Sequence, residues 1–244
     1  MKNVKFTIEY DGTNFAGWQR QVSERTVEGV IEKSLYKITG ERIDLVGAGR
    51  TDAGVHAIGQ VANFFTKSTI PGEKYKYALR FILPTDVSIV DSEEVDKDFH
   101  ARFSATGKIY RYRIYTGRLP KALLRPYSFF FPFRIDYNLL ERATEKFIGQ
   151  HDFSSFMARG ANSHNVFKTI RRFDIERDGD MVELIIEGDN FLRNMVRIMA
   201  GTAVYIGAGR IPLERLDTLL KGGRRDLAGP TFGPEGLYLE KVLY

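Results

Sequence analysis

The sequence predicts an α+β fold with a largely antiparallel sheet, arranged as two lobes of similar layout that meet along a groove. Two observations predict this fold class. Strand and helix patterns mix along the chain without the regular alternation of parallel α/β proteins, and their order begins again near residue 104. With 244 residues the chain can also bury a sizeable core. We therefore expect an N-terminal lobe at residues 1–104 and a C-terminal lobe at residues 105–244.

Five segments build the expected first lobe. Residues 3–10 alternate apolar and polar side chains, which is typical of a half-buried strand. Apolar residues then keep helical spacing over residues 27–38, and Gly40 follows as a C-terminal cap. Two strands are expected at residues 42–49 and 59–65. A further helix over residues 75–82 ends before Pro84.

The second lobe begins with a long strand over residues 104–115 and an apolar segment at 127–133. A helix is expected over residues 139–147. Asp178-Gly179-Asp180 separates two alternating runs, and Asp-Gly in that position is a strong hairpin signal. A long helix, a short helix and a closing strand follow, at residues 195–204, 213–220 and 237–244.

The composition excludes several kinds of site. The chain has no cysteine, so disulfides, thiolate zinc sites and a cysteine nucleophile are excluded. The first residues lack the apolar stretch of a signal peptide, and no run approaches the roughly 20 apolar residues of a membrane span. No cofactor signature is present. We expect a cytoplasmic protein that uses no cofactor and contacts no membrane.

Positive charge is modest in total but unevenly distributed. Lys and Arg number 36 against 31 acidic residues, which gives a net charge of +5. Residues 99–135 hold no Asp or Glu, and their basic side chains are Arg102, Lys108, Arg111, Arg113, Arg118, Lys121, Arg125 and Arg134. Basic residues interleaved with aromatics suit a polyanion that carries stackable bases. A strand whose arginines are merely solvated explains the same pattern.

The segment GAGRTDAGVHA at residues 47–57 carries the clearest chemistry. Gly47, Gly49 and Gly54 allow positive φ and close approach of a ligand to the backbone. Asp52 can act as a nucleophile or general base when ionised. Arg50 can keep it ionised, because a nearby cation lowers a carboxylate pKa. Strands on both sides would supply the rigid platform that a positioned site requires.

Two other interpretations of this segment remain open. Asp52 can cap a turn while Arg50 pairs with it on the surface, since Asp and Gly are common in turns. Asp52 and His56 are four residues apart, as two metal ligands on a helix can be, but Gly54 lies between them. We expect no metal. The glycines form no phosphate-cradling P-loop either, because no G-K-[ST] follows.

GRTDAGVHA resembles the signature of the TruA family of pseudouridine synthases, which isomerise uridines in the tRNA anticodon stem-loop. Further segments are similar to family segments in the family's order: FTIEYDGTNFAGWQRQ, KIYRYRIY, GQHDFSSF, NFLRNMVRIMAG and EGLYL. Together they span nearly the whole chain. The resemblance implies a cofactor-free isomerase that converts uridines 38, 39 and 40 of tRNA. It also implies a homodimer with two ferredoxin-like lobes that share a sheet around a central basic cleft.

The resemblance further implies that Asp52 is the nucleophile and that Tyr110 contacts the substrate. The target base must leave its stack, and an aromatic ring such as Tyr110 can receive it. A core aromatic on the face of Tyr112 explains Tyr110 equally well. Arg197 is a candidate second cation for Asp52 across the cleft, or else a helix-surface arginine that contacts phosphate. We assign no role to Arg193 and Asn194.

Phosphate contacts position an RNA without reading its sequence. Besides Arg50, the candidates for these substrate contacts are Arg20, Arg111, Arg113, Arg171 and Arg172. Two other classes compete with the isomerase. A non-catalytic RNA-binding module would gain nothing from a carboxylate that faces phosphates, and a metal-dependent phosphoesterase would need a ligand cluster that the sequence does not show.

Overall fold

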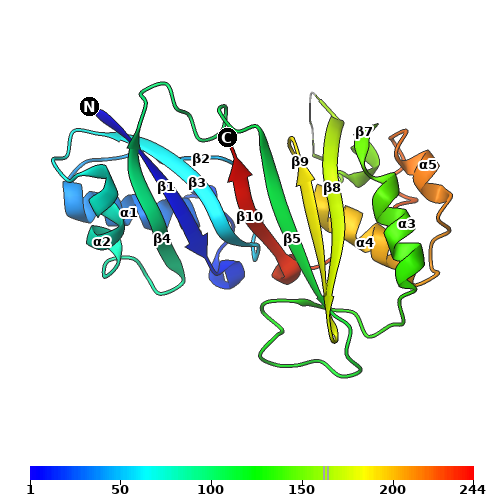
Figure 1. Ribbon diagram of the computed structural model, residues 1–244. Coiled ribbons are helices and arrows are strands. Elements are labelled where there is room, and N and C mark those ends of the chain that lie inside the picture. The colour runs from blue at the N-terminus through cyan, green and yellow to red at the C-terminus, as the bar shows by residue number, and fades with distance from the viewer. Residues whose placement is uncertain (162, 164) are drawn as a thin grey trace. The chain divides into compact units, whose positions relative to one another are not determined.

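The computed structural model describes residues 1–161, 163 and 165–244. The chain forms two compact units, one of residues 1–106 with 238–244 and the other of residues 107–237. Each combines strands with helices (Figure 1), which confirms the predicted α+β class. The basic cleft between the lobes stays a prediction.

The sheet of the first unit has the strand order β4-β1-β3-β10. β1 pairs antiparallel with both β3 and β4, and the short β2 also pairs with β3. The bounds are Lys2–Tyr10 for β1, Val46–Gly47 for β2, His56–Thr66 for β3, Val87–Val95 for β4 and Leu237–Leu243 for β10. β2 covers only residues 46–47 of the strand expected at 42–49. β4 was not expected from the sequence.

β10, the closing strand, belongs with the first unit from Tyr238 onward. It pairs parallel to β3, with Tyr238 beside His56 and Leu239 beside Ala57. From the sequence alone, these residues were expected in the C-terminal lobe at 105–244. The difference arises because an alternating pattern reveals a strand but not the strand with which it pairs.

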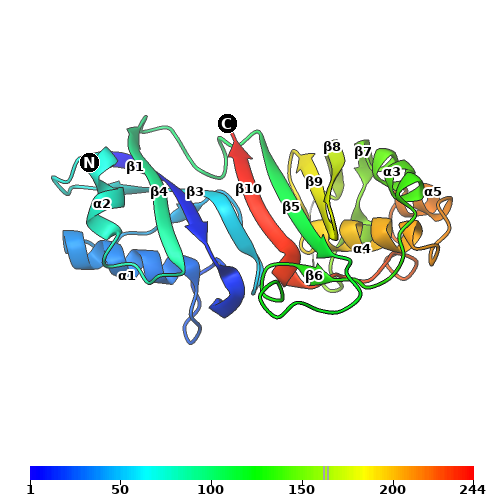
Figure 2. The same ribbon diagram turned by 60° about the horizontal axis from the view of Figure 1, so that its bottom comes forward.

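The core of the first unit lies between its sheet and α1, Val27–Thr39 (Figure 2). β1 buries Phe6 and Ile8 completely, as its alternating pattern predicts. α1 begins at the cap Thr26, whose side chain accepts from the Gly29 N–H, and ends at Gly40 in the left-handed region with φ 72°. The short α2, Tyr75–Leu79, packs beside β4.

The sheet of the second unit has the order β5-β9-β8-β7, with β6 beside β5. The bounds are Gly107–Tyr115 for β5, Phe129–Phe130 for β6, Gly149–Asp152 for β7, Phe167–Asp178 for β8 and Met181–Gly188 for β9. β8 and β9 form the predicted hairpin, and Gly179 in its turn has φ 55°.

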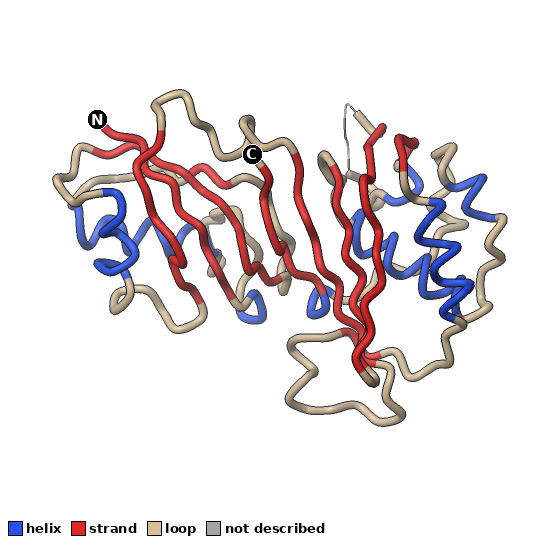
Figure 3. Tube along the Cα trace, in the orientation of Figure 1, coloured by secondary structure: helices blue, strands red, loops and turns tan. Residues whose placement is uncertain are grey.

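Helices pack on the apolar face of this second sheet (Figure 3). α3 spans Tyr137–Lys146, α4 spans Met195–Gly207 and α5 spans Arg215–Leu219. α4 is buried over most of its length, and Tyr112 and Leu184 of the sheet are fully buried. None of the helices among the described residues has the length and apolarity that a membrane span requires.

Candidate active site

The loop between β2 and β3, residues 48–55, carries Arg50 and Asp52 and is held to its surroundings at several points. The Gln60 side-chain amide of β3 donates to the Gly49 carbonyl at 2.9 Å. From the other side, the backbone N–H of Trp18 donates to the Thr51 carbonyl at 3.1 Å. The residues before and after Arg50 are therefore both fixed through their backbone, which gives the rigid platform that the sequence predicts.

Glycines let the segment around Trp18 approach this loop closely. Gly17 has φ +103°, and a Cβ there would lie 2.7 Å from the Thr51 carbonyl oxygen. A Cβ on Gly47 would lie 2.5 Å from the Trp18 indole nitrogen. Gly54 adopts the predicted left-handed conformation, with φ +77°. Gly47 and Gly49 do not have positive φ. At Gly47, the missing side chain leaves space for the Trp18 indole.

Tyr10, the last residue of β1, supports the loop from the protein interior. Its hydroxyl and the Thr51 hydroxyl share a hydrogen bond of 2.7 Å, and its side chain is 3% exposed. Burial raises the pKa of Tyr10, so the phenol stays neutral. Asp52 follows Thr51 and begins a turn. In this turn the Val55 N–H donates to the Asp52 carbonyl at 3.2 Å. The backbone of the candidate nucleophile is thus fixed on both sides.

Arg50 belongs to a chain of hydrogen bonds with residues that the sequence did not predict as site residues. Its Nε–H donates to Gln19 Oε1 at 2.9 Å, and Gln19 Nε2 donates to Glu28 Oε2 at 2.7 Å. Gln19 lies in a segment that resembles the family, but no spacing in the sequence links it to Arg50. The pairing of Arg50 with Asp52 stays a prediction.

His56, the first residue of β3, is buried and held by neighbouring groups. Its side chain is 2% exposed, and its Nδ1 accepts the Gly12 N–H at 3.1 Å. Its ring stacks on Tyr238 with centroids 4.7 Å apart. Asp11 Oδ1 lies 3.3 Å from the same nitrogen. Among the described residues, no group of three or more His, Asp or Glu side chains is arranged to hold a metal ion.

Tyr110 lies on β5 in the second unit. It shares the apolar face of the strand with Tyr112 and is 7% exposed. Its ring meets Phe191 edge-on, with centroids 5.1 Å apart and an interplanar angle of 81°. This environment agrees with a core aromatic and equally with a ring held ready for a base, so the substrate role of Tyr110 stays a prediction.

Arg197 lies in the first turn of α4 and is fixed within its unit. Its Nε donates to the Phe232 carbonyl at 2.6 Å, and its Nη1 donates to Asn194 Oδ1 at 3.1 Å. Asn194, with φ 63°, is the one residue other than glycine with positive φ in the described chain. Asn194, which received no role from the sequence, thus orients Arg197. The action of Arg197 on Asp52 stays a prediction.

The five arginines expected to contact phosphate all take part in ion pairs. Arg20 lies 2.8 Å from Glu32 and 3.7 Å from Asp44. On the second sheet, Arg111 and Arg113 of β5 both pair with Glu183 of β9, at 2.8 Å for Arg113. These two arginines of the acid-free run therefore lie next to a carboxylate in the fold, because the neighbouring strand β9 supplies it.

The remaining two arginines, on β8, face carboxylates at longer distances. Arg171 lies 3.8 Å from Glu187, and Arg172 lies 3.3 Å from Asp174 and 4.0 Å from Glu187. Both arginines are more than 40% exposed. Exposed pairs of this kind contribute about 0–1 kcal/mol, so exchange of a carboxylate for a phosphate costs little.

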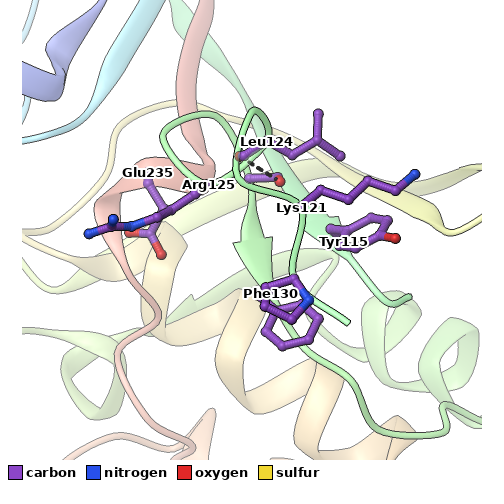
Figure 4. A pocket seen from close by; sticks show the side chains of 8 residues that line it. Tyr115, Lys121, Leu124, Arg125, Phe130 and Glu235 are labelled. Atoms are coloured by element: carbon purple, nitrogen blue, oxygen red, sulfur yellow. Dashed lines mark hydrogen bonds between the residues drawn. The ribbon is translucent and has the colours of Figure 1, made fainter. Parts of the chain in front are cut away.

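A small hollow lies elsewhere in the second unit, at the base of the loop after β5 (Figure 4). The Lys121 ammonium lies 5.0 Å from the centre of the Tyr115 ring, and Ser128 Oγ donates to the Leu124 carbonyl at 3.0 Å. The other lining residues are Pro120, Arg125, Phe130 and Glu235. None of the expected site residues lies among them.

Comparison with known proteins gives a consistent result. The profile of the family described as tRNA pseudouridine synthase matches residues 7–104 and 143–244. The tRNA pseudouridine synthase A of Acetivibrio thermocellus is 47% identical over 244 residues, which is all of both chains. The enzymes of that name from Clostridium botulinum and Caldicellulosiruptor saccharolyticus are 46% and 45% identical over the same full length.

Among solved structures, a Cbf5-Nop10-Gar1 complex matches distantly, with a TM-score of 0.36 and 13% identity over 83% of this chain and 45% of that one. The family profile and the full-length matches define the class of protein, an RNA-modifying isomerase. The chain belongs to the tRNA pseudouridine synthase family, and its relatives over the full length carry the name tRNA pseudouridine synthase A.

Proposed function

We propose that this protein converts uridines 38, 39 and 40 of the tRNA anticodon stem-loop to pseudouridine, with Asp52 as the nucleophile. The observation that carries the proposal is the loop of Asp52, whose backbone is anchored at Gly49, Thr51 and Asp52 itself. Membership of the family supports the reaction, and resemblance to the TruA family supports the positions in the tRNA.

The reaction breaks the C–N bond between uracil and ribose, turns the base and rejoins it through carbon. It needs no oxidant and no external group, since all atoms of the product come from the uridine. One carboxylate suffices to begin it, by attack on the sugar or base or by removal of a sugar proton. Asp52 supplies that carboxylate from a fixed backbone, and such fixation is what places a reacting group correctly.

The target base must first leave the stack, which costs a few kcal/mol. In our proposal the Tyr110 ring receives the base, since base–aromatic stacking contributes about 1–3 kcal/mol. Arg50 is exposed and lies two residues before Asp52. A guanidinium there is planar, binds carboxylate or phosphate through two hydrogen bonds and can stack in the gap that a flipped base leaves.

The test is to incubate the purified protein with unmodified tRNA and to map pseudouridine at nucleotide resolution. We expect modification at positions 38, 39 and 40 where these are uridines, and none in a matched tRNA with cytidine at those positions. Pseudouridine only at other positions would overturn the assignment of the target. A complete absence of pseudouridine under conditions where the tRNA binds would overturn the proposed reaction.

A further inference from the structure

A chain of polar contacts connects Arg50 to the first turn of α1. The Arg50 Nε–H donates to Gln19 Oε1 at 2.9 Å, and the Gln19 amide nitrogen donates to Glu28 Oε2 at 2.7 Å. The three residues come from three segments: the loop of Asp52, the loop after β1, and α1. Neither Gln19 nor Glu28 has a role in the proposed reaction so far.

Donor and acceptor chemistry fixes the orientation of the Gln19 amide. A guanidinium carries only donors, and a carboxylate carries only acceptors. The amide oxygen must therefore face Arg50, and the amide nitrogen must face Glu28. A glutamine links the two charged groups while Arg50 keeps its full charge for another partner.

Glu28 is the fixed end of this chain. Its side chain is 6% exposed. Besides the Gln19 amide, the backbone N–H of Arg20 donates to Glu28 Oε2, at 2.6 Å. Its own N–H donates to the Trp18 carbonyl at 3.1 Å. Glu28 is thus held to both neighbours of Gln19 in sequence, whereas Arg50 at the other end is exposed.

We infer that Gln19 and Glu28 are positioning residues, which hold the Arg50 guanidinium in one orientation for the reaction at Asp52. This inference rests on the proposed function. An exposed arginine samples many rotamers, and a bond at Nε removes much of that freedom. The two terminal amino groups carry the other four N–H donors, which can donate to a carboxylate, a phosphate or a base.

The first test replaces Gln19 by Met, which has nearly the same size but can neither accept from Arg50 nor donate to Glu28. Gln21→Met is the matched control, because Gln21 is exposed in the same loop. We expect Gln19→Met to lower the single-turnover rate at least ~10-fold while the tRNA Kd changes less than ~3-fold. Gln21→Met should keep both values. A Gln19→Met enzyme with the wild-type rate would overturn the inference.

Glu28 offers a conservative rescue. In Glu28→Gln the amide oxygen can accept the same two hydrogen bonds, so most of the rate should remain. Glu28→Ala should lose as much rate as Gln19→Met. A loss in Glu28→Gln equal to that in Glu28→Ala would show that the hydrogen bond to Gln19 is not what matters, and it would contradict the proposed role of Glu28.

A double-mutant cycle separates positioning from a general structural effect. If Gln19 acts through Arg50, Gln19→Met should cost little further rate once Arg50 is Lys. Multiplication of the two losses would mean that Gln19 acts independently of Arg50, and it would overturn the inference.

A readout without activity distinguishes this inference from the proposed function. The Arg50 Nε–H signal in NMR, assigned by its loss in Arg50→Lys, should exchange slowly with water in the wild type. It should exchange faster in Gln19→Met but not in Gln21→Met. Equal exchange rates of this signal in the wild type, Gln19→Met and Gln21→Met would overturn the inference, whatever the activity of these proteins. If the wild type makes no pseudouridine but the exchange pattern holds, the proposed function has failed and the Gln19–Arg50 contact stands.

Discussion

The hydroxyls of Tyr10 and Thr51 share a 2.7 Å hydrogen bond inside the protein. Thr51 directly precedes Asp52 in the sequence. The bond joins the end of β1 to the loop that carries the candidate nucleophile. Because Tyr10 is buried, its phenol stays neutral and can serve the loop as a fixed partner. We therefore expect this contact to stabilise the first unit and to help hold the loop of Asp52 in place.

Tyr10→Phe should remove this bond and leave the Thr51 hydroxyl without it. We expect the free energy of unfolding to fall by about 1–3 kcal/mol, the typical cost of an unsatisfied buried polar group. Urea denaturation measures the change. Tyr36→Phe is the matched control, because Tyr36 is 54% exposed. Equal stability of the two variants would show that the Tyr10 bond contributes nothing to the loop.

Arg50→Lys should reduce turnover far more than tRNA binding. A lysine keeps the charge, but it lacks the planar fork and the Nε–H that Gln19 accepts. We expect a single-turnover rate loss of at least ~100-fold, or about 2.7 kcal/mol. Single-turnover assays at saturating enzyme separate rate from binding. Arg42→Lys, in an exposed position on the same unit, is the control. A near-wild-type rate for Arg50→Lys would reduce Arg50 to a point charge.

Tyr110 is tested by a pair of substitutions. If the ring only stacks, Tyr110→Phe should keep its activity and Tyr110→Ala should lose it. If the phenol moves a proton, Tyr110→Phe should bind tRNA normally and stall in turnover. Unimpaired turnover by both variants would remove Tyr110 from the site and leave it as a packing partner of Phe191.

Glu28 predicts a pH dependence of stability. Burial raises the pKa of its carboxyl above the ordinary 4.5, so the folded chain binds this proton more tightly than the unfolded chain. Its stabilising contribution is therefore fully present below pH 4.5 and is lost as the pH rises through the folded pKa.

The difference in unfolding free energy between wild type and Glu28→Gln should accordingly shift against the wild type as the pH rises from about 4 toward neutrality. Urea denaturation at several pH values measures this difference. A difference that stays constant, or that moves in favour of the wild type with rising pH, would contradict the burial of an ionised carboxylate at this position.

The sequence predicted those elements that a short stretch of residues identifies by its own periodicity, cap or turn motif. α1 was predicted from its periodicity and from Gly40, and the hairpin of β8 and β9 from Asp178-Gly179-Asp180. β4 was missed because its pairing with β1 contains a register shift and its outer positions hold Asp91, Glu93 and Glu94. That interruption hides the period of two that identifies a strand.

The candidate site was only partly predictable for the same reason. Arg50 and Asp52 stand two residues apart, so the sequence alone predicts that they act together, and that pairing stays a prediction. Gln19 is 31 residues away from Arg50, and nothing local joins them. The basic run over 99–135 likewise gives no sign of Glu183, because Glu183 lies beside Arg113 only once β5 and β9 have paired.

If the Asp52 carboxylate performs the isomerisation, Asp52→Asn should abolish it. The substitution is nearly isosteric and removes only the ionised oxygen, so the fold and the tRNA affinity should remain. Pseudouridine mapping on tRNA treated with each enzyme should show modification at positions 38, 39 and 40 with the wild type and none with Asp52→Asn. Pseudouridine formed at those positions by Asp52→Asn at near the wild-type rate would rule out Asp52 as the nucleophile.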